Sequence, residues 1–450
     1  MQREGAARRA GTAKRERAAG MALTGRAAVA ALIGALVVLA FRNVAALLAV
    51  DALILAAIGA DLLLAAPVRA LRLTRAGDAR IRLGETGEVT LTMDNPSTRS
   101  LRGTVRDAWP PSTGARPGRA QASVPAGGEA RLVTTLSPQR RGDFAAARVT
   151  VRSLGPLRLA GRQGGHQAPW SVRVLPPFTS RRHLPEKLAR LRQLDGQHRS
   201  LLRGQGSEFD SLREYVIGDD VRSIDWRSSA RRVDVMVRTW RPERDRRILI
   251  VLDTGRTSAG RVAGVPRLDT SMDAALLLTA LATRAGDRID LIAVDRRVRA
   301  RVLGSSRSDV LPALTSAMAV LDAELIESDP GLMAATVLGI ARQRCLVVLL
   351  TDLNPAAIEE GLLPRVPALA ARHRLLVAAV ADPRLDEMAA ARGDAAAVYG
   401  AAAAERARSE RARITARLQR RGVEVVDAPP DRLPAALADA YLNLKAAGRL

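Results

Sequence analysis

Aromatic side chains and cysteine are scarce in this sequence. Phe, Trp and Tyr make up 2% of the 450 residues, so any core must be built from Leu, Val, Ile and Ala, and stacking platforms for single-stranded nucleic acids are rare. The single cysteine, Cys345, excludes a disulfide framework within the chain and favours a reducing compartment. It lies in an apolar run, where we expect a small buried side chain.

The signature motifs of two common enzyme classes are missing as well. No G-x-S-x-G nucleophile turn and no G-x-x-x-x-G-K-[S/T] phosphate loop occurs in the sequence. We also expect no Cys/His dyad, because Cys345 stands alone and His373 falls at the end of a basic helix. Catalysis is therefore not the leading expectation.

Positive charge is abundant and is carried almost wholly by arginine. Lysine and arginine number 70 against 46 acids, which gives a net charge of +24, and only three of the basic residues are lysines. Such a balance suggests nucleic acid, an anionic membrane surface or an acidic protein as a partner. A codon composition that favours arginine would produce the same excess without any function.

The first 66 residues divide into a basic tail and two apolar runs. Residues 1–22 are rich in Arg, Ala and Gly, which predicts a disordered tail. The runs 27–41 and 44–66 can each cross a hydrocarbon core of roughly 30 Å, and we expect a transmembrane helical hairpin over 23–66 rather than a signal peptide. Because arginines flank both sides, the positive-inside rule predicts that both flanks of the hairpin, and the bulk of the chain, lie in the cytoplasm.

Two acids, Asp51 and Asp61, interrupt the second apolar run. An acid inside a membrane is by default functional. The alternative is a contact between helices or subunits, or a position near the lipid headgroups, and we favour this second interpretation.

The rest of the chain changes from strand-like alternation to alternating strands and helices. Period-two patterns with Gly and Pro turns over 67–177 predict an antiparallel β-sandwich. Residues 178–245 are expected to form a connector, 246–428 a doubly wound α/β domain, and 429–450 a last helix. The strands of the α/β domain are expected at 248–253, 289–294, 345–351, 375–380 and 423–426.

Two carboxylates end strands of that sheet. Asp253 follows the first strand and Asp352 the third, and in a doubly wound sheet these strand ends can lie side by side. With the hydroxyls of Thr257 and Ser328 they would form an oxygen-rich pocket suited to a hard cation such as Mg²⁺. The alternative is that both acids cap helices and accept hydrogen bonds from loop N–H groups.

This layout resembles a von Willebrand factor A domain, whose metal site reads D-x-S-x-S after the first strand. The sequence departs from that pattern, because Gly255 stands at the first hydroxyl position and Arg256 brings a competing cation. The resemblance implies the fold, and the departures weaken the implied Mg²⁺ site.

Acids, arginines and aromatics are concentrated over residues 204–226 as nowhere else in the chain. This stretch resembles the bacterial family known as domain of unknown function 58, and together with the helical hairpin, the sandwich and the A-type domain the resemblance covers roughly residues 25–430. It implies an inner-membrane, cytoplasm-facing protein that accompanies MoxR-type AAA+ ATPases and has no established enzymatic activity. The matching residues are Gly206, Glu208, Phe209, Leu212, Arg213, Tyr215, Gly218, Asp219, Asp220, Arg222, Ile224, Asp225, Trp226, Ala230 and Arg231.

The sequence leaves two roles open for this motif. Its acids can pair with neighbouring arginines while its aromatic residues pack beneath, which would either clamp the connector to the α/β domain or form a recognition surface. The expected pairs join Glu208, Asp219, Asp220 and Asp225 with Arg213, Arg222, Arg227 and Arg231. The side chains expected to pack beneath them are Phe209, Tyr215, Ile224 and Trp226.

The leading hypothesis is a membrane-anchored adaptor that docks a MoxR-type ATPase or its unknown client protein in cell-envelope assembly or protein maturation. One alternative is a metal-dependent hydrolase that uses Asp219, Asp220 and Asp225, although nearby arginines would compete with the metal. A third alternative is a protein that binds nucleic acid through its basic residues. The leading hypothesis includes no nucleic acid among the partners. The client and the oligomeric state stay open.

Overall fold

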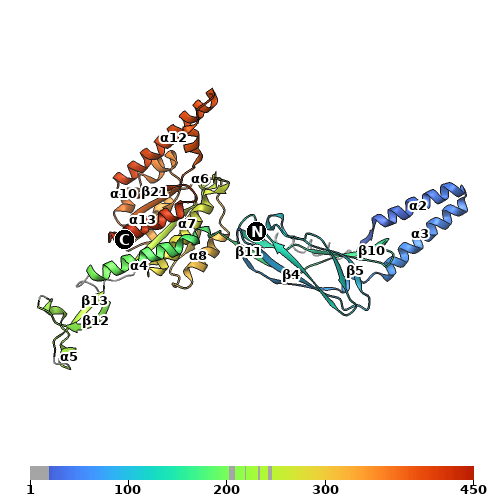
Figure 1. Ribbon diagram of the computed structural model, residues 1–450, viewed down its shortest axis with the longest axis horizontal. Coiled ribbons are helices and arrows are strands. Elements are labelled where there is room, and N and C mark those ends of the chain that lie inside the picture. Colours follow the sequence, from blue (N-terminus) through green and yellow to red (C-terminus); the bar gives the residue numbers. More distant parts are fainter. Residues whose placement is uncertain (1–19, 202–207, 218, 232–233, 242–245) are drawn as a thin grey trace. The chain divides into compact units, whose positions relative to one another are not determined.

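The computed structural model describes residues 20–201, 208–217, 219–231, 234–241 and 246–450. The chain divides into two compact units, Met1–Leu175 and Pro176–Leu450, and each is described by itself (Figure 1). Most of the predicted basic tail, residues 1–19, lies outside the described residues. The end of that tail was predicted wrongly, because residues 20–22 belong to strand β1 (Gly20–Leu23), which also takes Leu23 from the predicted helical hairpin.

The first unit begins with two apolar helices, α2 (Gly25–Phe41) and α3 (Val44–Leu64). Arg42 adopts the left-handed conformation, with φ of 49°, and ends α2. Asn43 then begins α3, because its side chain accepts a hydrogen bond from the N–H of Ala45 at 2.9 Å. Two polar residues thus suffice to turn the chain from one apolar helix into the next.

The two helices differ as candidate membrane spans. Segment Val44–Ala70, which is α3 with the short turn η1 (Val68–Ala70), is long and apolar enough to cross a membrane, whereas α2 has 17 residues. The helices pack closely at Gly34, where an added Cβ would lie 2.6 Å from Cγ1 of Val50. Within the described residues, length and composition therefore support one span where the sequence predicts two.

Three sheets make up the rest of the first unit. Their strand orders are β1-β10-β9-β5-β6, β2-β4-β7 and β3-β11-β8. Neighbouring strands are antiparallel except β3 and β11, which are parallel. The strands are β2 (Arg72–Gly77), β3 (Arg80–Arg82), β4 (Gly87–Asp94), β5 (Leu101–Asp107), β6 (Ala120–Val124), β7 (Glu129–Leu136), β8 (Gly142–Ala145), β9 (Val149–Leu154), β10 (Ala160–His166) and β11 (Ser171–Leu175).

Alternating apolar residues of these strands form the main core of the first unit. Leu91 and Met93 of β4 pack with Leu101 and Val105 of β5 and with Val151 of β9. The β2-β4-β7 sheet therefore faces the five-stranded sheet across a shared core. A β-rich domain built on alternation is confirmed, and the parallel β3–β11 pair departs from the predicted antiparallel pattern.

Both ends of the helical hairpin are fastened to the turn between β9 and β10. Before α2, strand β1 pairs with β10, and the hydroxyl of Thr24 donates to the carbonyl of Arg158 at 2.6 Å. At the end of α3, the carboxylate of Asp61 accepts hydrogen bonds from the N–H groups of Leu157 (2.7 Å), Leu159 (2.6 Å) and Ala160 (3.1 Å). The turn between β9 and β10 of the five-stranded sheet is therefore in contact with the ends of both helices.

This contact explains Asp61, which is fully buried. An added Cβ at Gly155 would lie 2.3 Å from Oδ1 of Asp61, so only glycine lets the turn approach the carboxylate. Asp61 is therefore neither a free intramembrane acid nor a contact between helices. Asp51 differs, because it lies exposed on α3.

The second unit is organised around a six-stranded sheet of order β18-β17-β14-β19-β20-β21. All neighbours are parallel except β18, which is antiparallel to β17. Chain order reverses at β14, so the carboxyl ends of β14 and β19 meet at a topological switch point. The strands are β14 (Arg247–Asp253), β17 (Arg288–Val294), β18 (Val298–Val302), β19 (Leu346–Leu350), β20 (Arg374–Val380) and β21 (Glu424–Ala428).

Helices cover both faces of this sheet. Ile250 of β14 belongs to one core with α7, α8 and α13, whereas Val251 belongs to a second core with α9, α10 and α12. Continuously apolar strands are required because each face is buried, and a doubly wound α/β domain is the result. The helices are α7 (Arg267–Arg284), α8 (Val310–Ala319), α9 (Pro330–Ile340), α10 (Val366–Ala370), α12 (Ala395–Arg420) and α13 (Leu433–Ala446).

Shorter elements complete the second unit. The predicted connector contains helix α4 (Leu184–Leu201) and a hairpin of β12 (Glu208–Glu214) and β13 (Met236–Arg241). Between the hairpin strands lie the turn η4 (Val221–Ser223) and helix α5 (Trp226–Ser229). The remaining elements are η2 (Pro111–Thr113) in the first unit and η3 (Thr179–His183), α6 (Arg256–Ala259), β15 (Arg261–Val262), β16 (Val265–Pro266), η5 (Ala357–Leu362) and α11 (Arg384–Ala390) in the second.

Candidate functional site

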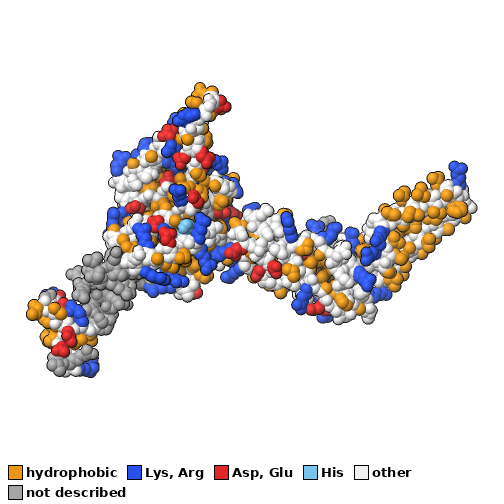
Figure 2. Space-filling model, viewed as in Figure 1, with side chains coloured by type: hydrophobic (Ala, Val, Ile, Leu, Met, Phe, Trp, Pro, Cys, Tyr) orange, Lys and Arg blue, Asp and Glu red, His pale blue; other side chains and the backbone are white. Residues whose placement is uncertain are grey.

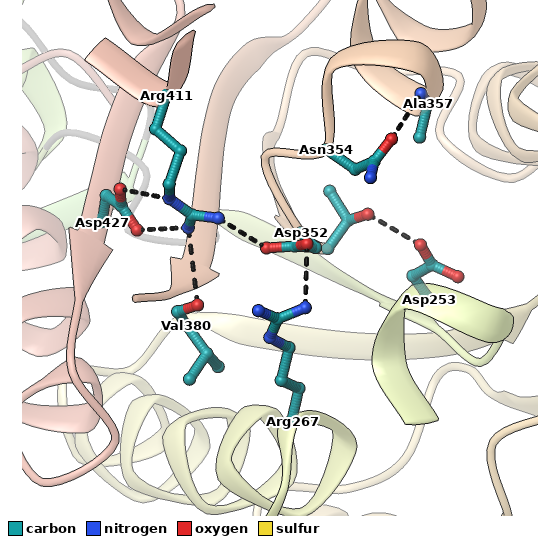
Figure 3. A network of polar contacts seen from close by, with 9 residues as sticks. Asp253, Arg267, Asp352, Asn354, Ala357, Val380, Arg411 and Asp427 are labelled. Atoms are coloured by element: carbon teal, nitrogen blue, oxygen red, sulfur yellow. Dashed lines mark hydrogen bonds and ion pairs between the residues drawn. The ribbon is translucent and has the colours of Figure 1, made fainter. Parts of the chain in front are cut away.

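Asp253 and Asp352 lie where the sequence predicts them, at the carboxyl ends of β14 and β19 (Figure 3). Asp253 is buried, and its carboxylate accepts hydrogen bonds from the N–H of Gly255 (2.9 Å) and the hydroxyls of Thr351 (2.7 Å) and Ser328. An added Cβ at Gly255 would lie 2.1 Å from the Ser328 hydroxyl. The missing serine of the D-x-S pattern therefore leaves space that the hydroxyl of a distant loop fills.

Asp352 is held by two arginines rather than by hydroxyls (Figure 3). Its carboxylate lies 3.0 Å from Nη1 of Arg267 and 2.9 Å from Nη1 of Arg411. Arg411 also binds Asp427 at 2.7 Å. Burial opposes the charge of Arg411, yet the hydrogen bonds and charges of Asp427 and Asp352 raise its guanidinium pKa above the ordinary value. The arginines were missed because their partner acids lie far away in the sequence.

The donor set at these strand ends does not fit the predicted Mg²⁺ site. A divalent cation at Asp352 would have to displace two guanidinium groups. Among the residues that the structure describes, no hydrogen bond joins the side chain of Thr257, in α6, to Asp253 or Asp352, and no group of three His, Cys, Asp or Glu is arranged to hold a metal. We therefore derive no metal chemistry from this cluster.

A third acid, Asp295, joins the same edge of the sheet at the end of β17. Its carboxylate accepts from the hydroxyl of Thr254 at 3.1 Å and pairs with Arg299 at 2.5 Å. Burial would raise the pKa of Asp295, but the hydrogen bonds of Arg299, Arg297 N–H and Thr254 lower it. The signal was present in the sequence, since Asp295 follows an apolar strand as Asp253 does.

The motif forms the β12–β13 hairpin, which is stabilised by internal ion pairs. Asp219 pairs with both Nη atoms of Arg213, at 2.5 and 2.7 Å, and accepts the N–H of Val216. These interactions lower the pKa of Asp219, the Arg213 hydrogen bond first. The predicted pairing of Arg213 is present in the structure.

Other predictions for the motif were wrong. Asp225 pairs with Arg238 of β13, 2.8 Å from its Nε, instead of with Arg222, Arg227 or Arg231. Its pKa is lowered by the hydrogen bond from Ser228 N–H and by Arg238. Asp220 begins η4 by accepting the N–H of Arg222 at 3.0 Å. Asp219, Asp220 and Asp225 therefore each have separate partners, and within the described part of the hairpin they form no group with a third ligand that could hold a metal.

The remaining motif residues are placed unevenly. Tyr215 is half-buried, and its N–H donates to the carbonyl of Val235. Arg231 and Arg222 are exposed. Glu208 and Phe209 pair by backbone register with Arg241 and Trp240 of β13. The predictions for Gly206 and Gly218 lie outside the described residues, as do those for the side chains of Glu208 and Phe209.

An exposed apolar set is the feature of the hairpin that the sequence reasoning missed. Ile217 is 96% exposed, Trp226 67%, Val216 62% and Val221 61%. The prediction that Trp226 packs beneath the ion pairs is therefore wrong. Figure 2 shows hydrophobic side chains gathered on the part of the surface that Figure 1 labels β12, β13 and α5. We call Val216, Ile217, Val221 and Trp226 the hairpin patch.

Cys345 and His373 form a contact that the sequence reasoning excluded. The sulfur of Cys345 lies 3.5 Å from Nδ1 of His373, and both side chains are buried. They meet because each precedes one of the paired strands β19 and β20. Burial raises the pKa of the thiol to about 11, and burial with the charges of Arg372 and Arg247 lowers that of His373. Both groups are kept neutral, the opposite of an activated thiolate–imidazolium pair.

Comparison with known proteins gives relatives without an assigned activity. Uncharacterized proteins from Mycobacterium bovis and from two strains of Mycobacterium tuberculosis are 28% identical to this chain over 195 residues. The alignment covers 42% of this chain and 60% of each relative, so the chain spans less than two thirds of their length.

Two solved structures can be aligned with parts of the chain. The CARDB domain of PF1109 from Pyrococcus furiosus is 16% identical, with a TM-score of 0.18, and the alignment covers 23% of this chain and 91% of that domain. Proximal thread matrix protein 1 from the mussel byssus is 14% identical, with a TM-score of 0.28 and coverage of 45% and 47%. Scores this low establish no shared fold. Residues 211–425, from the motif hairpin to β21, match the family model described as Protein of unknown function DUF58.

Proposed function

We propose that this chain is a membrane-anchored adaptor whose hairpin patch docks a MoxR-type AAA+ ATPase or that ATPase's client. The carrying observation is the hairpin patch itself, in which one aromatic and three aliphatic side chains are each more than 60% exposed within the short segment 216–226. Exposed apolar groups that gather on one small element mark interaction sites, and Trp is among the residues that dominate binding energy. The partner's identity comes from the family resemblance, which the match over 211–425 supports.

The internal ion pairs of the β12–β13 hairpin favour a role in binding a partner protein over a role in catalysis. A two-stranded hairpin is marginally stable by itself, and here the ion pairs Arg213–Asp219 and Asp225–Arg238 fix its shape. Because these two acids are engaged within the hairpin, it presents the apolar side chains to a partner together with the exposed arginines Arg222, Arg227 and Arg231. Among the described residues, these acids form no group of three that could hold a hydrolytic metal.

The anchor is proposed to be the helical hairpin α2–α3 with the bulk of the chain in the cytoplasm. Large apolar side chains of both helices are exposed, and Figure 2 shows them along the surface of the two helices. Because β1 and Asp61 fasten both ends of the hairpin to β10 and its preceding turn, the chain enters and leaves the helices on the same side. Two spans of this kind return the chain to its starting side, where flanking arginines favour the cytoplasm.

The α/β unit is proposed to be von Willebrand factor A-like. Its strand order and the strand-end acids Asp253 and Asp352 support this, while the arginines on Asp352 mark a departure that replaces metal chemistry with internal ion pairs. In this proposal the α/β unit is the folded scaffold that carries the hairpin patch. Cell-envelope assembly or protein maturation is the process that the family resemblance implies.

A binding measurement tests the proposal. Full-length protein in detergent is immobilised, and the MoxR-type ATPase of the same genome is passed over it with ATP analogue or ADP. We expect Trp226→Ala to raise the Kd about 30-fold or more, because truncating a central Trp typically costs about 2 kcal/mol or more.

The matched control is Tyr399→Ala, which removes an aromatic side chain that is 78% exposed on α12, outside the hairpin. It should leave the Kd unchanged. Failure of the wild-type protein to bind in every nucleotide state, or equal losses in the two variants, would refute the docking role.

A further inference from the structure

A cavity of about 410 Å³ lies at the base of the helical hairpin, within the first unit. It is lined by Gly20 and Met21 of β1, Leu62 of α3, Pro67, Val68 and Arg69 at η1, and Arg162 of β10. Its volume falls in the range of small-ligand sites. It opens where α3 ends, which is the level of the lipid headgroups if α3 spans a membrane.

The carbonyl groups at the end of α3 hold arginine side chains beside the cavity. The last carbonyls of a helix have no partner within it and attract cations. Here Nε of Arg162 donates to the carbonyl of Leu62 at 2.9 Å, and Nη1 of Arg99 donates to the carbonyl of Leu63. A guanidinium has five N–H donors, so Arg162 can hold the helix end and still face a ligand in the cavity.

The surroundings combine arginine with apolar side chains. Arg26 and Arg158 are exposed on the two segments that meet at this base. Met21 and Leu23 of β1 are also exposed, at 73% and 59%. The acid in these segments, Asp61, is buried and bound by backbone N–H groups, so it does not face the cavity as an exposed negative charge.

We propose that this cavity binds the headgroup of an anionic phospholipid, with its phosphate on Arg162 and Arg69 and its acyl chains along the exposed apolar surface of α3. Arginine binds phosphate with paired N–H groups, and basic pockets beside membrane helices bind such headgroups. The inference rests on the membrane anchoring proposed above and is independent of the hairpin patch. The bound lipid would fix the depth of the first unit against the membrane.

The test is lipid binding to the full-length protein. Detergent-solubilised protein is titrated with phosphatidylglycerol or with phosphatidylcholine, and bound lipid is counted by native mass spectrometry. We expect preferential binding of phosphatidylglycerol, and the double variant Arg69→Gln/Arg162→Gln should weaken it about 10- to 30-fold. Arg162→Lys keeps the charge and should retain most of the preference.

The matched control is Arg119→Gln, because Arg119 is exposed beside β6, at the sheet edge opposite β1, and its loss removes one charge elsewhere on the same unit. It should bind phosphatidylglycerol as the wild type does. Hydrogen exchange of β10 shows whether the double variant is still folded, and a partly unfolded variant is replaced by Arg69→Gln alone, for which a loss is again expected.

Equal binding of the two lipids by the wild type, equal losses in the double variant and the control, or displacement of the lipid by inorganic phosphate would overturn the inference. Membrane insertion is measured in parallel by flotation with vesicles. If the protein does not insert, both the anchoring and the lipid site fall. If it inserts without lipid preference, only the lipid site falls.

Discussion

Replacing Asp61 by Ala removes the carboxylate that joins α3 to the turn between β9 and β10. Three backbone N–H groups, those of Leu157, Leu159 and Ala160, lose their acceptor. A buried donor left without a partner costs about 1–3 kcal/mol, and two of these donors are near enough to the surface to recover water. We therefore expect the free energy that opens this turn to fall by about 2–4 kcal/mol.

Hydrogen exchange of the full-length protein in detergent measures that free energy directly. A loss of 2–4 kcal/mol corresponds to exchange about 30- to 900-fold faster at the three amides. The control is Asp51→Ala, which removes an exposed acid from the same helix and should leave the turn unchanged. Unchanged exchange in Asp61→Ala, or equal acceleration in both variants, would refute the account of the anchor.

Three further predictions concern the second unit. Asp352→Ala leaves two arginines without their shared carboxylate and should lower the free energy of unfolding by about 3–5 kcal/mol, measured by denaturant titration, with no recovery on adding Mg²⁺. Lys445→Met removes the positive charge that pairs with the buried Asp287 and leaves only the Tyr441 hydroxyl among the printed side-chain donors to it, so it should cost a similar amount. Because burial raises the pKa of Asp287, the folded state holds the Asp287 proton more tightly than the unfolded chain does. Stability therefore returns as the pH falls and is lost as the pH rises through that pKa. Asp219 has a lowered pKa, so its stabilisation of the hairpin is present above its ordinary pKa of 3.8 and is lost as the pH falls below that value. Exchange of the hairpin amides should accelerate there. Arg213→Gln should weaken that dependence, and the part due to Val216 N–H and to Asp225 should remain. The roles given to Asp287 and Asp219 would be contradicted if the free energy of unfolding of Lys445→Met did not change with pH. They would also be contradicted if hydrogen exchange of the hairpin amides were not accelerated at low pH.

The fold could be predicted where a pattern is local. Continuous apolar strands alternate with helices over the α/β unit because both faces of its sheet are buried, and that pattern is visible without the structure. The β18 hairpin strand and the parallel β3–β11 pair were missed, since short strands carry few alternating residues. Strand β1 was missed, with residues 20–22 assigned to a tail and Leu23 to the helical hairpin, because a strand added to the edge of a sheet depends on a partner about 140 residues away.

The candidate sites were harder, because their partners are distant in sequence. Asp253 and Asp352 could be placed at strand ends, but Arg411 reaches Asp352 from a helix 59 residues later, and no local pattern indicates this. Cys345 and His373 meet only through strand register. The aromatic content of the motif suggested packing, yet Trp226 is 67% exposed, and no local pattern in the sequence indicates this.

Site-directed photo-crosslinking in native membranes tests the docking claim most directly. A photoreactive residue replaces Ile217, which is 96% exposed in the hairpin patch, or Tyr399 on α12 as the control. The account predicts that the crosslinked partner at position 217 is identified by mass spectrometry as the MoxR-type ATPase or a protein bound to it, and that position 399 gives no such product. Crosslinking to the ATPase from position 399 alone, or from neither position, would contradict the account.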